Sequence, residues 1–250
     1  MKLLLTSSGI NNTSVRNALV DLLGKPIAES NALFVPVGVY PFRYGQRYAW
    51  NPIGGEAAPR MCQLGWKSIG ILELSVLPSI DKKNWLPSLE EADALLVWGG
   101  DPLFINYWMQ ESGLSKYLPS LFDKLVYVGV SAGSITVATI FAETYSTDRS
   151  CAGSPLTTEE IVFSSPEGEI HRTLITAKGM GLTDFAIIPH YENKNHIDAC
   201  STNAEKWASK LPVPVYAIDD ETAIKVINGS IEVISEGHWK LFTVEETKNR

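Results

Sequence analysis

A serine between two glycines follows a short apolar stretch of the chain. Residues 129–133 read Gly-Val-Ser-Ala-Gly, and residues 125–130 are typical of a strand covered on both faces. Residues 132–142 predict a helix, because apolar and helix-forming residues recur there at helical spacing. A strand joined to a helix through Gly-x-Ser-x-Gly is the setting of a nucleophile elbow, in which small neighbours permit a tight turn. We therefore expect Ser131 to be a nucleophile and the N–H of Ala132 to stabilise an oxyanion. The alternative is that this turn only joins a strand to a helix.

A serine nucleophile needs a base, and the chain has four histidines. His190 follows the apolar stretch 186–188, so it is expected at the carboxyl end of a strand, beside the elbow. His171 lies in a polar stretch, His196 begins a predicted helix and His238 lies near charged residues. The sequence therefore favours His190 as the base that takes the serine proton.

The second ring nitrogen of such a base needs a carboxylate to orient it. Glu143 and Asp148 come after the elbow and before His190. Asp184 is expected at the opposite end of the strand that leads to His190. Asp219 and Asp220 open a loop and are more typical of a turn. The residues alone leave this choice open.

Apolar strands alternate with amphipathic helices along the chain. This pattern predicts an α/β fold, a doubly wound and mostly parallel sheet with helices on both faces, as one domain over residues 1–250. The loops at residues 7–9, 99–101 and 129–133 are expected to converge at the carboxyl ends of strands. Asn228-Gly229 predicts a C-terminal β-hairpin.

Composition excludes several classes of function. The formal net charge is −7 and no basic tract is present, which argues against a nucleic-acid partner. Cys62, Cys151 and Cys200 lack metal-ligand or disulfide spacing, so we expect reduced thiols and no metal site. No apolar stretch is long enough to span a bilayer and no signal peptide is recognisable, so a cytoplasmic protein without a membrane partner is expected.

Three motifs in this order resemble the peptidase E family: Gly99-Gly100-Asp101, the elbow at residues 129–133, and Ile188-Pro189-His190. These are S51-type serine dipeptidases whose fold is class I glutamine amidotransferase-like and flavodoxin-like. The resemblance implies that Ser131 is the nucleophile and His190 the base, with an oxyanion hole at the N–H groups of Gly100 and Ala132. It implies an acidic third member after the elbow helix, for which Asp148 fits best and Glu143 second.

The family resemblance also implies the reaction. The expected activity is hydrolysis of small peptides, dipeptides with N-terminal aspartate, through an acyl-enzyme, without a cofactor, by a monomer or homodimer. A substrate carboxylate needs a nearby cation, and Arg43, Arg47, Arg149 and Arg172 are the candidates. Asp101, Val130 and Ile135 depart from the family pattern, which bears on the substrate. The alternatives are a cyanophycinase-like peptidase, an esterase, or a non-catalytic amidotransferase-like binding domain.

Overall fold

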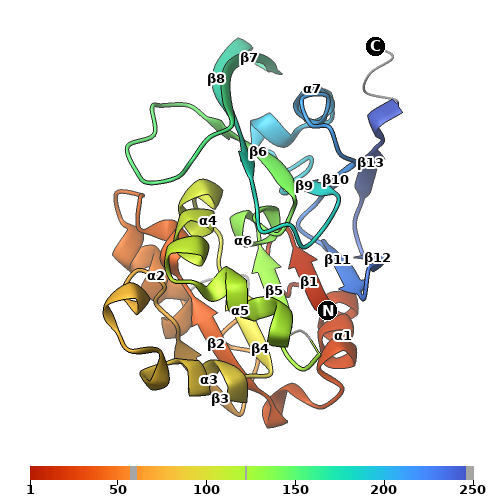
Figure 1. Cartoon of the computed structure of the whole chain (residues 1–250). Coiled ribbons are helices and arrows are strands. Elements are labelled where there is room, and N and C mark those ends of the chain that lie inside the picture. The colour runs from red at the N-terminus through yellow and green to blue at the C-terminus, as the bar shows by residue number, and fades with distance from the viewer. Residues whose placement is uncertain (57–60, 122, 246–250) are drawn as a thin grey trace.

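The computed structural model describes residues 1–56, 61–121 and 123–245. A seven-stranded sheet runs through it, built from β1 (Lys2–Thr6), β2 (Asn31–Val35), β3 (Ser68–Ile71), β4 (Ala94–Val97), β5 (Val126–Val130), β11 (Thr222–Ile227) and β12 (Ser230–Ser235). The strand order is β12-β11-β1-β5-β4-β2-β3 (Figure 1). The strands from β1 to β3 in this order are mutually parallel, and β11 and β12 add an antiparallel edge beside β1.

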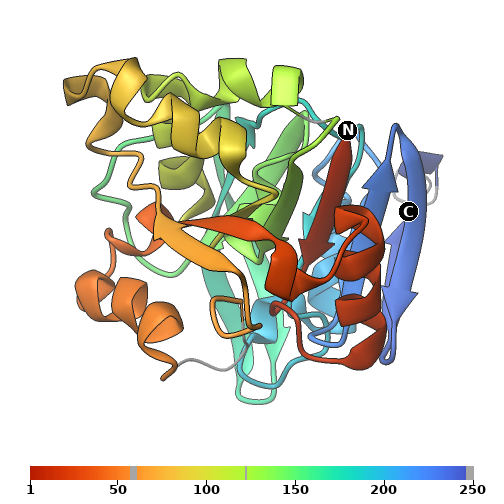
Figure 2. The ribbon, with the colours of Figure 1, turned by 90° about the horizontal axis from the view of Figure 1, so that it is seen from below.

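Helices cover both faces of this sheet because its inner strands are apolar on both faces. Side chains alternate along β1: Leu3 and Leu5 pack with α3 (Leu86–Glu91), α4 (Pro102–Glu111) and α5 (Leu114–Leu121), whereas Leu4 packs with α1 (Thr13–Leu23). Figure 2 shows α3 and α5 on one side of the sheet and α1 on the other. This is the predicted doubly wound α/β architecture, and that prediction is confirmed.

Two smaller sheets adjoin the carboxyl ends of the parallel strands. One contains β9 (Ala186–Ile188), β10 (Val215–Ile218) and β13 (Trp239–Phe242), with β9 parallel to β10. The other contains β6 (Ile140–Tyr145), β7 (Thr157–Ser165) and β8 (Gly168–Lys178), and its β7–β8 end projects at the top of Figure 1. The remaining helices are α2 (Gly45–Gly54), α6 (Ala132–Ile135) and α7 (Ser201–Ala208), with short 3-10 turns at Ile27–Glu29, Val37–Val39, Leu77–Ser79, Lys82–Asn84 and Ile197–Ala199.

Two local predictions have different outcomes. The hairpin is confirmed: β11 and β12 are joined by Asn228 and Gly229, whose φ angles of 50° and 86° are those that a tight hairpin turn requires. The helix predicted over residues 132–142 is wrong, because α6 ends at Ile135 and the chain then enters β6. Thr136, Val137, Thr139 and Ile140 are β-branched, which disfavours a helix, and residues 140–142 pair with β8 instead.

Within the described ranges, every helix falls short of the combined length and apolarity that crossing a bilayer would require.

Candidate active site

Ser131 lies on the sharp turn between β5 and α6. Its backbone has φ 50° and ψ −115°, a conformation that L-residues rarely adopt and that persists only where the surroundings impose it. The Ser131 N–H donates to the carbonyl of Thr6 at 3.0 Å, which ties the turn to β1. A Cβ at Gly133 would lie 2.2 Å from the carbonyl oxygen of Val97, so only glycine fits there. The residue types of the elbow therefore follow from backbone crowding at the sheet edge.

His190 follows β9 and brings an imidazole to this serine. Its Nε2 lies 3.1 Å from Ser131 Oγ, and its side chain is 17 % exposed. The His196 ring stacks on the His190 ring with centroids 4.0 Å apart and planes 16° apart. Burial, together with the neighbouring His190, lowers the pKa of His196. The structure thus brings together the two residues, Ser131 and His190, that the sequence singled out as nucleophile and base.

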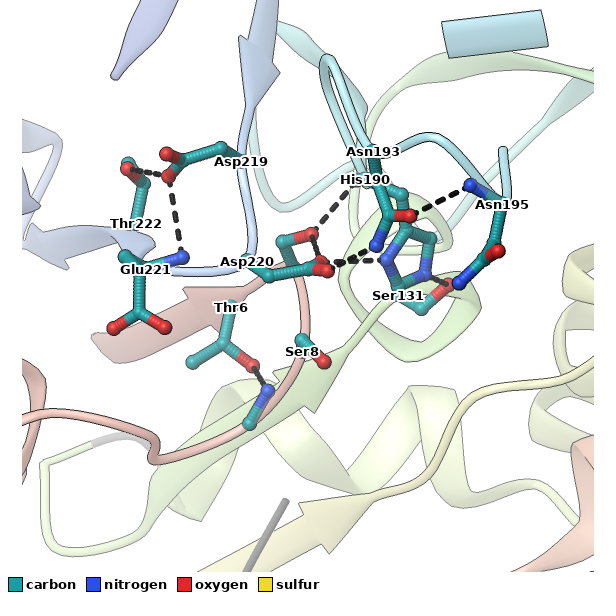
Figure 3. Close-up of polar contacts among 12 residues, drawn as sticks. Thr6, Ser8, Ser131, His190, Asn193, Asn195, Asp219, Asp220, Glu221 and Thr222 are labelled. Atoms are coloured by element: carbon teal, nitrogen blue, oxygen red, sulfur yellow. Dashed lines mark hydrogen bonds and ion pairs between the residues drawn. The ribbon is translucent and has the colours of Figure 1, made fainter. Parts of the chain in front are cut away.

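Asp220 is the carboxylate that holds the other nitrogen of His190. Its Oδ1 lies 2.7 Å from His190 Nδ1 and accepts from Ser7 Oγ at 3.0 Å, and its Oδ2 accepts from Asn193 Nδ2 at 2.5 Å (Figure 3). Burial alone would raise the pKa of Asp220, but the contacts with His190, Asn193 and Ser7 outweigh it and lower the pKa to about 2. An ionised carboxylate only accepts, so Nδ1 carries the ring proton and Nε2 is free to accept from the Ser131 hydroxyl.

Asp219 shapes the turn that presents Asp220. Its Oδ1 accepts from Glu221 N at 3.2 Å and from Thr222 Oγ1 at 2.5 Å, and its Oδ2 accepts from His238 N at 2.7 Å. Figure 3 shows the two neighbouring aspartates pointing in different directions, Asp219 into the turn and Asp220 toward His190. The turn role expected of this pair therefore applies to Asp219, whereas Asp220 faces the imidazole.

The carboxylates expected beside His190 lie elsewhere. Asp148 is exposed in the loop after β6, and Glu143 lies on β6, where its Oε1 accepts from the N–H of Thr144 at 2.8 Å. The expectation of Asp148, or secondly Glu143, as the partner of His190 is therefore corrected to Asp220. A signal for Asp220 was present in the sequence: it follows an apolar strand, β10, just as His190 follows β9. Since β9 and β10 are parallel neighbours, their carboxyl ends lie together.

The two expected oxyanion donors come from different loops beside the serine. Ala132 is the first residue of α6, so its N–H has no partner inside that helix. Gly100 lines the same cavities as Ser131 and has φ 126°, and a Cβ added there would lie 2.1 Å from the carbonyl oxygen of Gly38. The loop after β4 can therefore approach the serine only with glycine at this position.

Asp101 follows Gly100 and fixes the loop after β4 through contacts with α4 and Arg149. It accepts from Phe104 N at 2.7 Å as the N-cap of α4, and Arg149 Nε and Nη2 donate to its two oxygens at 2.8 and 3.0 Å. Both side chains are almost fully buried. Asp101 therefore serves as a helix cap and an ion-pair partner next to Gly100. The Arg149 guanidinium is occupied by its hydrogen bonds to Asp101.

Two cavities meet at Ser131 and share Phe42, Gly100, Ser131 and His190. One, called here the apolar cavity, has a volume of about 410 Å³ and is walled by Val39, Phe42, Tyr48, Pro52 and Trp98. The other, called the polar cavity, has a volume of about 430 Å³ and is lined by ionisable side chains that include Glu143, Arg172 and Asp198. Both volumes are in the range of small-ligand sites. Ser8, Gly100 and Ser131 all line these cavities, so the predicted convergence of the three loops is confirmed.

The polar cavity contains opposite charges in contact. Arg172 Nε donates to both oxygens of Asp198, at 2.8 and 3.1 Å. Burial, reinforced by the negative charges of Asp101 and Asp198, raises the pKa of Glu143 to about 8. Among the described residues, no group of three or more His, Cys, Asp or Glu side chains is arranged to hold a metal ion.

Comparisons with known proteins agree with this architecture. The model of peptidase family S51 matches residues 3–234. A proposed peptidase E protein from Listeria monocytogenes EGD-e aligns with a TM-score of 0.61 at 16 % identity, covering 94 % of this chain and 98 % of that one. A peptidase from an acI-B1 actinobacterium aligns with a TM-score of 0.58 at 17 % identity, covering 97 % of this chain and 93 % of that one. A search of curated proteins found no match. At these identities, the two solved structures show a shared fold.

Proposed function

Because the chain belongs to peptidase family S51, we propose that it is a serine dipeptidase that hydrolyses dipeptides with N-terminal aspartate through Ser131, His190 and Asp220. The observation that carries this proposal is the continuous hydrogen-bonded series from Asp220 through His190 to Ser131, at the point where two cavities meet. A nucleophile, a base and an orienting carboxylate in this arrangement are the components of acyl transfer.

The proposed reaction has two halves. Asp220 holds the imidazole, and His190 Nε2 removes the hydroxyl proton as Ser131 Oγ attacks the scissile carbonyl carbon. The N–H groups of Gly100 and Ala132 stabilise the resulting oxyanion, and His190 then gives its proton to the departing amine. A water molecule repeats the sequence on the acyl-enzyme, which releases the acid and restores the serine.

The polar cavity supports the preference for N-terminal aspartate. Such a residue presents an α-ammonium and a β-carboxylate, and the cavity offers the Glu143 carboxyl for the first and the Arg172 guanidinium for the second. Arg172 is paired with Asp198, but it is the arginine of the four considered from the sequence that lines the polar cavity. Arg149 is buried against Asp101 outside that lining, and Arg43 and Arg47 are exposed near or on α2. Arg172 is therefore the cation we assign to the substrate carboxylate.

Labelling and hydrolysis together test the function. A fluorophosphonate probe should modify Ser131, identified by peptide mass spectrometry, and Asp-Leu should be cleaved while simple esters are poor substrates. Preferred cleavage of esters would indicate an esterase, and tight retention of a small ligand by a protein that resists labelling would indicate a binding domain.

Arg172→Gln should reduce kcat/KM for Asp-Leu by roughly 10- to 100-fold, the effect of losing a hydrogen bond between charged groups. Hydrolysis of Asn-Leu, which lacks the carboxylate, should change much less, so the ratio of the two substrates is the measurement. Arg47→Gln is a matched control, since Arg47 is exposed on α2. An equal loss for both substrates would remove Arg172 from carboxylate recognition.

Gly100→Ala should lower kcat by about 10²- to 10³-fold, the usual cost of losing one oxyanion donor. The added Cβ would collide with the carbonyl of Gly38 and displace the loop at a φ that alanine rarely adopts. Gly113→Ala is the control, because it too replaces a glycine of positive φ, but with open space around the new methyl group. A fully active and stable Gly100→Ala protein would exclude Gly100 as a donor.

A further inference from the structure

The apolar cavity is a distinct compartment on one side of the nucleophile. Its lining includes Gly99, Gly100, Ser131 and His190, so a group bound in it lies next to the proposed nucleophile and base. Its walls differ in chemistry from those of the polar cavity: they consist mainly of aliphatic and aromatic side chains, namely Val39, Phe42, Tyr48, Pro52, Trp98 and Val130. The two compartments therefore favour chemically different parts of a substrate.

Two aromatic walls of this cavity are left open to solvent. Phe42 and Tyr48 are 48 % and 45 % exposed, although each offers a large apolar surface. Apolar surface gathered around a concave site is typical of ligand binding, because a bound apolar group removes that surface from water. Asn51 adds one polar atom to the lining: among the described residues its buried Oδ1 has no hydrogen-bond partner, so it is available to a donor on a bound molecule.

A dipeptide bound with its scissile carbonyl at Ser131 must place its two residues on different sides of the nucleophile. The N-terminal aspartate matches the charges of the polar cavity, which leaves the apolar cavity for the second residue. We propose that the apolar cavity binds the side chain of the C-terminal residue of the dipeptide and selects large apolar side chains such as those of leucine, methionine and phenylalanine. This inference rests on the proposed function.

A series of dipeptides with the same first residue measures this selectivity. The kcat/KM of the wild-type enzyme should rise roughly 10- to 100-fold from Asp-Gly to Asp-Leu or Asp-Phe, as several carbon atoms leave water. Asp-Lys and Asp-Glu should remain near Asp-Gly, because the cavity offers their charges no partner of opposite sign. Equal rates across the series, or a preference for charged second residues, would overturn the proposal.

Tyr48→Ala shortens one wall of the cavity and should reduce kcat/KM for Asp-Phe by about 5- to 10-fold, while Asp-Gly changes less than twofold. Tyr44→Ala is the matched control, since Tyr44 is 49 % exposed just before the same helix but does not line the cavity. An unchanged ratio of Asp-Phe to Asp-Gly in Tyr48→Ala would contradict the assignment.

Binding to a catalytically silent protein separates this inference from the proposed function. Calorimetry with the Ser131→Ala protein should show Asp-Phe binding about 10-fold more tightly than Asp-Gly, and adding Tyr48→Ala should remove most of this difference. If the wild-type protein cleaves neither dipeptide but this binding preference is found, the peptidase proposal fails and the cavity assignment stands. Cleavage without any preference would refute the cavity assignment alone.

Discussion

Ser131→Ala should abolish dipeptide hydrolysis, with kcat reduced by about 10⁵-fold or more, because in the proposed mechanism this residue supplies the atom that attacks the carbonyl. Fluorophosphonate labelling should disappear at the same time. The substitution removes one oxygen atom at a residue whose N–H is bonded to Thr6, so the elbow should persist and thermal unfolding should change little.

Ser120→Ala is a suitable control for the loss of a serine hydroxyl. Ser120 is exposed on α5, where its Oγ donates to the carbonyl of Tyr117. Activity and labelling should both survive this change. Retention of wild-type turnover by Ser131→Ala would rule out the proposed mechanism, whatever the geometry around His190.

Asp220→Asn should lower kcat by about 10³- to 10⁴-fold, because an amide no longer fixes the tautomer that leaves Nε2 unprotonated. Asp148→Asn should leave kcat close to that of the wild-type enzyme, since Asp148 is exposed in the loop after β6. These two variants make the same chemical change and differ only in position. A large loss in Asp148→Asn with an active Asp220→Asn would restore the sequence-based assignment.

The stability lost in Asp220→Asn should also depend on pH. The pKa of Asp220 is lowered to about 2 by its contacts, below the usual carboxyl value, so ionisation of Asp220 stabilises the fold above about pH 4, and this contribution is lost as the pH falls toward 2. The difference in Tm between the wild-type protein and Asp220→Asn should therefore be present at pH 7 and shrink in acid.

The fold and two members of the site could be predicted from the sequence because their signals are local. Burial of β1, β4 and β5 can be inferred from their own apolar residues. The crowded backbone around Ser131 can likewise be inferred from the glycines beside it. The carboxylate could not be chosen in this way, because the pairing of β9 with β10 brings together residues 30 positions apart. The predicted helix after Ser131 failed for a similar reason, since its last residues, 140–142, pair with a strand more than 30 residues later.

Ser7 links parts of the chain that belong to two different sheets. Its Oγ accepts from the backbone N–H of His190 at 2.7 Å and donates to Asp220, so one hydroxyl at the end of β1 holds both residues. His190 and Asp220 follow strands of the smaller sheet, whereas Ser131 follows a strand of the central sheet. The proposed reaction centre therefore lies across the boundary between the two sheets. Relative displacement of the two sheets would break the contacts of Ser7 with His190 and Asp220 as well as the contact between His190 and Ser131. The Ser7 hydroxyl therefore opposes the motion that would separate the imidazole from the serine.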